Sequence, residues 1–199
     1  MEIKRIINLC KSSNGLILYE NEGEQWISDG YALFPLTEMP LFDEETICRT
    51  YDISEKKAAK MSIRHEMQLP PRISVAGDVD GEMPCEFDDE LFARIVPVWT
   101  SKGLMFIQRR YLTPFADTPA DMLYLFERHT PDGGVYFAVK VGFQLMGLIS
   151  PYECVNEGFV ERIKRIYEQC EVALENKKKG EDYDRKEIHR RHGVAGAVQ

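Results

Sequence analysis

The sequence predicts an α+β protein in which an antiparallel sheet is covered by helices. Apolar residues recur at three- and four-residue spacing near both ends of the chain, as on one face of a helix. Aromatic and β-branched runs, which are typical of strands, fill much of residues 104–149. The composition, 44% hydrophobic and 29% charged, is that of an ordinary globular protein. We therefore expect a single compact domain over residues 1–177 and a flexible, charged tail over residues 178–199.

The N-terminal segment has the pattern of a helix followed by a hairpin. Residues 2–10 place Ile3, Ile6 and Cys10 on one face of a helix. Gly15 suits the left-handed residue that often follows a helix. The strands expected next are residues 16–19 and residues 25–36, the second interrupted by a bend or bulge at Asp29-Gly30.

Further strands and helices are expected along the rest of the chain. Ser54 is a good first residue for a polar helix, and an apolar face at Ile95, Val98 and Trp99 predicts another. Pro151 is expected to open a long final helix. The expected helices are residues 54–67, 88–99 and 151–177, and the expected strands are residues 46–53, 72–76, 83–87, 104–112, 122–128 and 135–149.

The final predicted helix carries an apolar stripe. Phe159, Ile163, Ile166 and Cys170 recur at steps of four, three and four residues, which predicts an amphipathic helix that docks on the sheet or on a partner. The segment that follows offers almost nothing to bury, because residues 177–191 hold seven basic and four acidic side chains. A mobile tail is the expected result.

Charge and cysteine usage exclude several classes of protein. A formal net charge of −8 disfavours broad adhesion to nucleic acid or to an anionic membrane. Five cysteines occur singly, with no CxxC pair, so neither a zinc ribbon nor a thioredoxin-like site is expected. Free structural thiols are typical of a reducing compartment. No apolar run approaches the ~20 residues that span a bilayer, and the N-terminus lacks a secretory pattern. We expect a cytoplasmic protein with no membrane partner.

The candidate metal and catalytic motifs are incomplete. Residues 77–82, GDVDGE, contain a DxDG fragment, but the later ligands of a calcium loop are out of place, so a hairpin turn is favoured. His189 and His192 are three residues apart, with no further ligand nearby. The sequence has no glycine-rich phosphate loop and no GxSxG elbow. We therefore predict no metal, no cofactor and no catalytic residue, which favours a protein that is not an enzyme.

The two halves of the chain share an expected order of elements. Residues 12–20, SSNGLILYE, echo residues 100–108, TSKGLMFIQ. The later half is expected to run β-α-β-β-β, and the earlier half α-β-β with a candidate third strand. This order suggests a pseudo-repeat of residues 1–70 and 71–150.

The segment SDGYAL at residues 28–33 adds a second likeness. In the bacterial sliding clamps of DNA replication a strand reads apolar-x-apolar-T-D-x-x-R-L, and the repeated unit is β-α-β-β-β. The segment and the element order together resemble this processivity-fold family. The resemblance implies a clamp-like fold and DNA as a partner, with Lys4, Arg5 and Lys11 as the candidate nucleic-acid contacts. Two features depart from the family: Ala32 stands in place of the arginine, and the later predicted helix is acidic.

Three functions stay open on the sequence alone. Missing catalytic motifs and an acidic chain favour a non-enzymatic binding or assembly module with a protein partner. A sheet face rich in exposed aromatic side chains would be its binding surface. The resemblance implies the alternative, a clamp-like accessory factor of DNA replication from a phage or mobile element. The third function is an enzyme whose site residues come together only in the fold.

Overall fold

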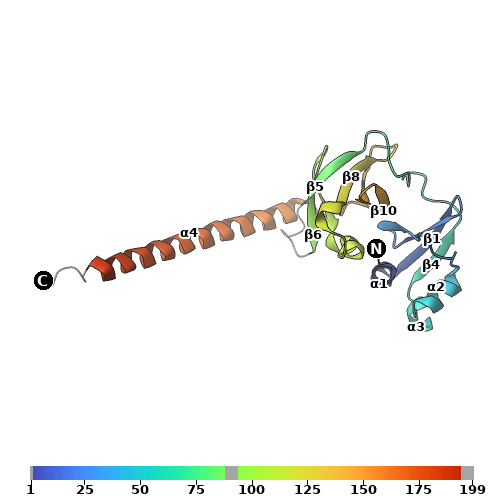
Figure 1. Ribbon diagram of the computed structural model, residues 1–199, viewed down its shortest axis with the longest axis horizontal. Helices are drawn as coiled ribbons and strands as arrows, with labels where there is room; N and C mark the ends of the chain where they lie inside the picture. Colours follow the sequence, from blue (N-terminus) through green and yellow to red (C-terminus); the bar gives the residue numbers. More distant parts are fainter. Residues whose placement is uncertain (1, 88–93, 194–199) are drawn as a thin grey trace. The chain divides into compact units, whose positions relative to one another are not determined.

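The computed structural model describes residues 2–87 and 94–193, and for residues 179–193 the backbone alone. The chain divides into two units, residues 1–153 and residues 154–199. We call the first unit the body. Its helical segments are α1 (Ile3–Ser13), α2 (Glu44–Thr50), α3 (Glu55–Ala58) and the 3-10 helices η1 (Arg109–Phe115) and η2 (Ala120–Met122) (Figure 1). Its strands are β1 (Gly15–Asn21), β2 (Glu24–Ser28), β3 (Ala32–Pro35), β4 (Ser62–Glu66), β5 (Met83–Phe87), β6 (Ile95–Thr100), β7 (Gly103–Gln108), β8 (Leu123–His129), β9 (Val135–Val141) and β10 (Gln144–Ile149).

The described strands form one ten-stranded sheet in the order β4-β1-β2-β3-β10-β9-β8-β5-β6-β7. The β1–β4 pair is parallel, and the other neighbours are antiparallel. Two meanders meet where β3 pairs with β10, through Leu33 with Leu148 and Ala32 with Ile149. Gly147 makes this meeting close, because a Cβ there would lie 2.9 Å from the Phe34 ring. These elements confirm the predicted α+β class.

Apolar side chains are buried on both faces of the sheet. One face packs against α1 and η1, in a cluster that includes Ile6, Ile7, Cys10, Leu18, Ile27, Phe34, Tyr111, Phe115, Phe137 and Val139. On the other face Trp26, Leu33, Tyr136, Ala138, Leu145 and Leu148 form a smaller cluster. Residues 67–82, which we call the covering segment, pack Leu69, Ile73 and Val75 against this second cluster.

Arg128 of β8 attaches the covering segment to the sheet. Its side chain is fully buried and pairs with Glu82 at 2.7 Å. The same guanidinium donates to the carbonyl oxygens of Ser74, Ala76 and Gly77 at 2.9–3.1 Å. A buried charge is tolerated only when it is paired and hydrogen-bonded, and this guanidinium satisfies both conditions.

The SDGYAL segment is a chain reversal. β2 ends at Ser28 and β3 begins at Ala32, and the two strands pair antiparallel. The Asp29 carboxylate accepts hydrogen bonds from the backbone N–H groups of Tyr31 and Ala32 at 3.0 and 3.1 Å, a local pattern typical of turns. Its other oxygen accepts from the Tyr111 hydroxyl at 3.0 Å. The interruption predicted at Asp29-Gly30 is therefore confirmed, but residues 25–36 form two antiparallel strands and not one bent strand, because this aspartate stabilises a full turn.

Predictions near the N-terminus and in the middle of the chain had mixed outcomes. The first helix is confirmed as α1, but Asn14, with φ 56°, takes the left-handed position expected for Gly15. Residues 46–53 were predicted as a strand and lie mostly in α2, which begins with a capping box at Asp43. Ser54 does cap a helix, but that helix ends at Ala58 and β4 follows. Residues 72–76 belong to the covering segment and form no strand.

A helix was predicted over residues 88–99, and the structure contradicts this prediction for residues 95–99. Residues 88–93 lie outside the described residues, and Ile95–Thr100 form β6. These residues pair antiparallel with β7, and Val96, Pro97 and Val98 are all buried in the sheet. The three- and four-residue spacing of Ile95, Val98 and Trp99 was therefore a coincidence of sequence.

The strands of the second half were predicted in part. Those at residues 83–87 and 122–128 are confirmed as β5 and β8. Residues 135–149 contain two strands, β9 and β10, and residues 104–112 end in η1. The β-α-β-β-β units are not confirmed, because the first half runs α-β-β-β-α-α-β.

The second unit contains one long helix in its described part, α4 (Glu157–Gly193). Asn156 caps it, with its side-chain oxygen accepting from the Phe159 N–H at 3.0 Å, so the helix begins later than Pro151. The compact body ends at Glu153, short of the expected boundary at residue 177. The helix continues through Gly193, into the segment expected as a tail. None of the described helices is both long and apolar enough to cross a membrane.

Candidate functional site

Five large apolar side chains stand exposed on one part of the sheet. We call them the apolar patch: Trp99 (48% exposed), Leu104 (48%), Met122 (44%), Tyr124 (45%) and Phe143 (97%). The sequence analysis expected aromatic side chains on an exposed sheet face. It could not choose these five, because strand alternation alone does not say which face is covered.

Strand register brings the members of the patch together. Trp99 of β6 pairs directly with Leu104 of β7, and with Glu86 of β5 on its other side. The neighbouring pair Cys85–Leu125 sets β5 against β8, which places Tyr124 in the same row as Glu86. The row therefore crosses four neighbouring strands.

Met122 and Phe143 lie at the strand ends beside the row, in η2 and in the β9–β10 turn. Phe143 sits in the two-residue turn between β9 and β10, after Gly142 with its φ of 60°. The Gly142 N–H donates to the Met122 carbonyl at 2.9 Å, so this turn lies beside η2. The turn conformation calls for glycine at position 142, but nothing in its backbone calls for phenylalanine at the next position.

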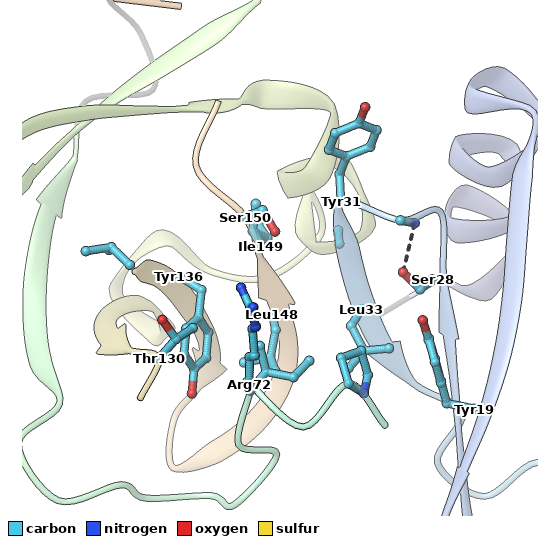
Figure 2. A pocket seen from close by; sticks show the side chains of 15 residues that line it. Tyr19, Ser28, Tyr31, Leu33, Arg72, Thr130, Tyr136, Leu148, Ile149 and Ser150 are labelled. Atoms are coloured by element: carbon cyan, nitrogen blue, oxygen red, sulfur yellow. Dashed lines mark hydrogen bonds between the residues drawn. The ribbon is translucent and has the colours of Figure 1, made fainter. Parts of the chain in front are cut away.

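A side pocket lies on the sheet face that carries the covering segment (Figure 2). Its volume is about 300 Å³. Leu33 and Leu148, a directly paired couple of β3 and β10, lie at its base with Tyr136 of β9. Arg72 of the covering segment also lines it, and Tyr19 of β1 lies at one end.

The three candidate nucleic-acid contacts all lie on α1, but they differ in the contacts that they make within the protein. Arg5 pairs with Glu2 at 2.7 Å and with Asp117 at 2.8 Å, and also donates to the Thr113 carbonyl at 3.0 Å. These contacts tie α1 to η1 and its following loop. Lys11 donates to the Tyr51 carbonyl at 2.9 Å. Lys4 is exposed and lines, with Lys11, a hollow of about 210 Å³.

The structure also brings together a serine, a glutamate and a histidine that the sequence analysis did not connect. The buried Glu127 accepts from the Ser101 hydroxyl at 2.5 Å and from the Ser101 backbone N–H at 2.7 Å. Its carboxylate also lies 3.0 Å from His129 Nε2. The serine hydroxyl thus bonds to the carboxylate and not to the imidazole, unlike an activated nucleophile, which bonds to its base. This cluster fixes the turn between β6 and β7.

Metal and thiol chemistry have little geometric support among the described residues. No group of three or more histidine, cysteine, aspartate or glutamate side chains is arranged there to hold a metal ion. Asp78 of the DxDG fragment pairs with Lys140 at 2.6 Å. His189 and His192 lie where only the backbone is described. The five cysteines are free thiols, and burial raises the pKa of Cys85 to about 11, which keeps that thiol protonated.

Comparison with known proteins assigns the chain to no family. No protein-family model matches the chain, and no curated protein or solved structure shows significant similarity to it.

Proposed function

We propose that the body is a protein-binding module and that the apolar patch is its contact surface. The observation that carries this proposal is the 97% exposure of Phe143, on a turn whose conformation does not require an aromatic residue. An exposed phenylalanine keeps its apolar surface in water, and burying it against a partner would gain roughly 1.5–3 kcal/mol. Burial of the patch against a partner would therefore be favourable.

The residue types of the patch support a protein as the partner. Trp99, Tyr124, Phe143 and Met122 belong to the residue types that are enriched in the centres of protein interfaces, and tryptophan and tyrosine dominate measured binding hot spots. Glu86 is exposed within the same row and supplies a charged group at the surface. The net charge of −8 favours a partner whose rim is basic, because complementary charge speeds association and excludes wrong partners.

Site-specific photo-crosslinking in the cells that express the protein tests this proposal. A benzophenone amino acid replaces Phe143 in the full chain, and Leu41, which is 60% exposed and outside the patch, serves as the matched control. We expect position 143 to crosslink to a defined protein and position 41 to give no such product. An excess of unlabelled wild-type chain should suppress the product by competition.

The Trp99→Ser/Tyr124→Ser double variant provides the second control. Because both side chains are about half exposed, the variant should fold, yet as a competitor it should fail to suppress the crosslink. Equal products from positions 143 and 41, or full competition by the double variant, would contradict the proposal. A product that contains two copies of this chain would identify self-association as the function of the patch.

A further inference from the structure

The side pocket has an unusual charge for this protein. The chain carries 33 acidic residues and a net charge of −8, yet the described residues that line the pocket include Arg72 and no aspartate or glutamate. A neighbouring hollow at the covering segment, of about 520 Å³, shows the opposite balance, because Glu20 and Glu22 line it without a basic residue. Among the described residues, the one charged side chain in the lining of the side pocket is thus an arginine, on a chain whose net charge is negative.

The polar groups of the side pocket are arranged as donors. Ser28 Oγ accepts the Gly30 N–H at 2.9 Å, which leaves its own O–H free to donate. The hydroxyl of Tyr19 makes no hydrogen bond within the described part of the chain, and Figure 2 shows it pointing toward Ser28. Burial and the charge of Glu66 raise the pKa of Tyr19, so this hydroxyl keeps its proton at neutral pH.

Arg72 supplies the charged donor. Figure 2 shows its side chain reaching from the covering segment toward the middle of the pocket. Its guanidinium is held by Asp132 at 3.0 Å, in a pair whose side chains are 73% and 55% exposed. Exposed pairs of this kind contribute little, and a guanidinium has five N–H donors. Arg72 therefore has donors left for a ligand anion.

The base of the pocket indicates that part of the ligand is apolar. Leu33, Leu148 and the ring of Tyr136 are buried and apolar, and about 300 Å³ is at the small end of ligand pockets. We infer that the side pocket binds a small carboxylate with an apolar body, the carboxylate meeting Arg72 and the hydroxyls and the apolar part lying on this base. The chemistry is shared by a free organic acid and by the C-terminal residue of a peptide. This site is separate from the apolar patch and does not depend on its function.

Titration of the full chain with matched probes tests the inference. Phenylacetate represents a free acid, N-acetylphenylalanine represents a peptide C-terminus, and phenylacetamide is the neutral control. Binding is followed by chemical-shift changes of protein resonances. We expect phenylacetate to bind at submillimolar concentration and phenylacetamide to bind at least tenfold more weakly, because it lacks the charge that Arg72 recognises. Tighter binding of N-acetylphenylalanine than of phenylacetate would identify the peptide terminus as the ligand source.

Variants of exposed or partly buried residues keep the test independent of folding. Arg72→Gln should weaken phenylacetate binding at least tenfold, and Arg72→Lys should restore part of it. Arg49→Gln, at a side chain 75% exposed and outside the pocket lining, should leave binding unchanged. Tyr19→Phe removes only a hydroxyl and should weaken binding severalfold. Absence of binding by both acids at millimolar concentration, equal binding of the neutral amide, or equal losses in Arg72→Gln and Arg49→Gln would overturn the inference.

Discussion

The body and α4 carry the same apolar spacing with different outcomes. In α1 the stripe is buried, and Ile6 is 0% exposed, because η1 and one face of the sheet pack against it. In α4 the stripe is partly exposed, and Ile166 is 50% exposed. Spacing thus predicts that a helix forms and which residues share a face, but it does not predict what covers that face.

The apolar stripes of α1 and α4 differ in burial because the two helices have different parts of the chain to pack against. The partners of α1 come from residues 16–149, which fold back on it through the sheet. α4 follows the compact body in sequence and belongs to a separate unit. A helix needs packing for most of its stability, so the exposed stripe of α4 is the feature that a partner or a second contact would change most.

The largest expected difference in stability is between two variants that place an aspartate on the apolar stripe of α1 or of α4. Ile6→Asp places an unpaired charge in the core and should destabilise the body by more than about 4 kcal/mol. Ile166→Asp should leave the body within about 0.5 kcal/mol of wild type, as a surface change does. Urea unfolding followed by tryptophan fluorescence measures this, since both tryptophans, Trp26 and Trp99, lie in the body. A loss of several kcal/mol in Ile166→Asp would mean that the two units do not fold independently.

The second contrast lies within the body, between a buried and an exposed arginine. Arg128→Ala leaves Glu82 and three backbone carbonyls without their guanidinium partner, which should cost about 3–5 kcal/mol. Arg64→Ala, at a side chain 57% exposed, should change the stability by no more than about 0.5 kcal/mol. Similar unfolding midpoints for the two variants would show that the covering segment is not held by Arg128.

A smaller effect is expected from pH at the covering segment. The hydrogen bond and charge of Lys140 hold the pKa of Asp78 below its ordinary value of 3.8. Its contribution to stability is therefore present above about pH 3.8 and is lost as pH falls through the lowered pKa of the folded protein. We expect wild type to lose more stability than Asp78→Asn between about pH 5 and pH 3. Asp80→Asn, two residues along the same segment, is the control and should follow wild type.

The smallest expected effect is in the binding of nucleic acid. Variants in each unit show which of the two would carry any such binding. Arg5 is committed to two carboxylates and the chain is acidic, so we expect no measurable binding to mixed-sequence duplex DNA at physiological salt. Binding that survives this salt and is abolished by Lys4→Glu with Arg5→Glu would favour the clamp-like alternative. Binding that is lost only on deleting residues 177–191 would assign the contact to α4.

Local patterns predicted part of the fold correctly. The first helix, β5, β8 and the cap at Ser54 follow from spacing, composition and capping chemistry within a few residues. The errors fell where contacts with other parts of the fold overrode a local pattern. Residues 95–100 read as a helix face, but pairing with β5 and β7 made them a strand. A bend or bulge within one strand was predicted at Asp29-Gly30, but the chain reverses there, and Asp29 accepts a hydrogen bond from Tyr111, 82 residues away.

The candidate sites depended far more on distant contacts. The apolar patch joins residues of β6, β7, β8, η2 and the β9–β10 turn, and the sequence predicted only an exposed sheet face rich in aromatic side chains, without its members. The side pocket could not be predicted, because Tyr19, Arg72 and Leu148 have no common motif and meet only across β1, the covering segment and β10. A search for buried apolar strands that neighbour a lone arginine would have given too many choices.

The sequence by itself determined the α+β class and the amphipathic helices at its two ends, because these follow from contacts between residues a few positions apart. The tertiary structure decided which side chains are covered, for the burial of a residue depends on partners anywhere in the chain. Ile6 and Ile166 have equivalent places in their helices, and only packing separates them. In the same way Arg128 is a core residue and Arg72 a pocket residue, because their surroundings supply partners for all of the first guanidinium and for only part of the second.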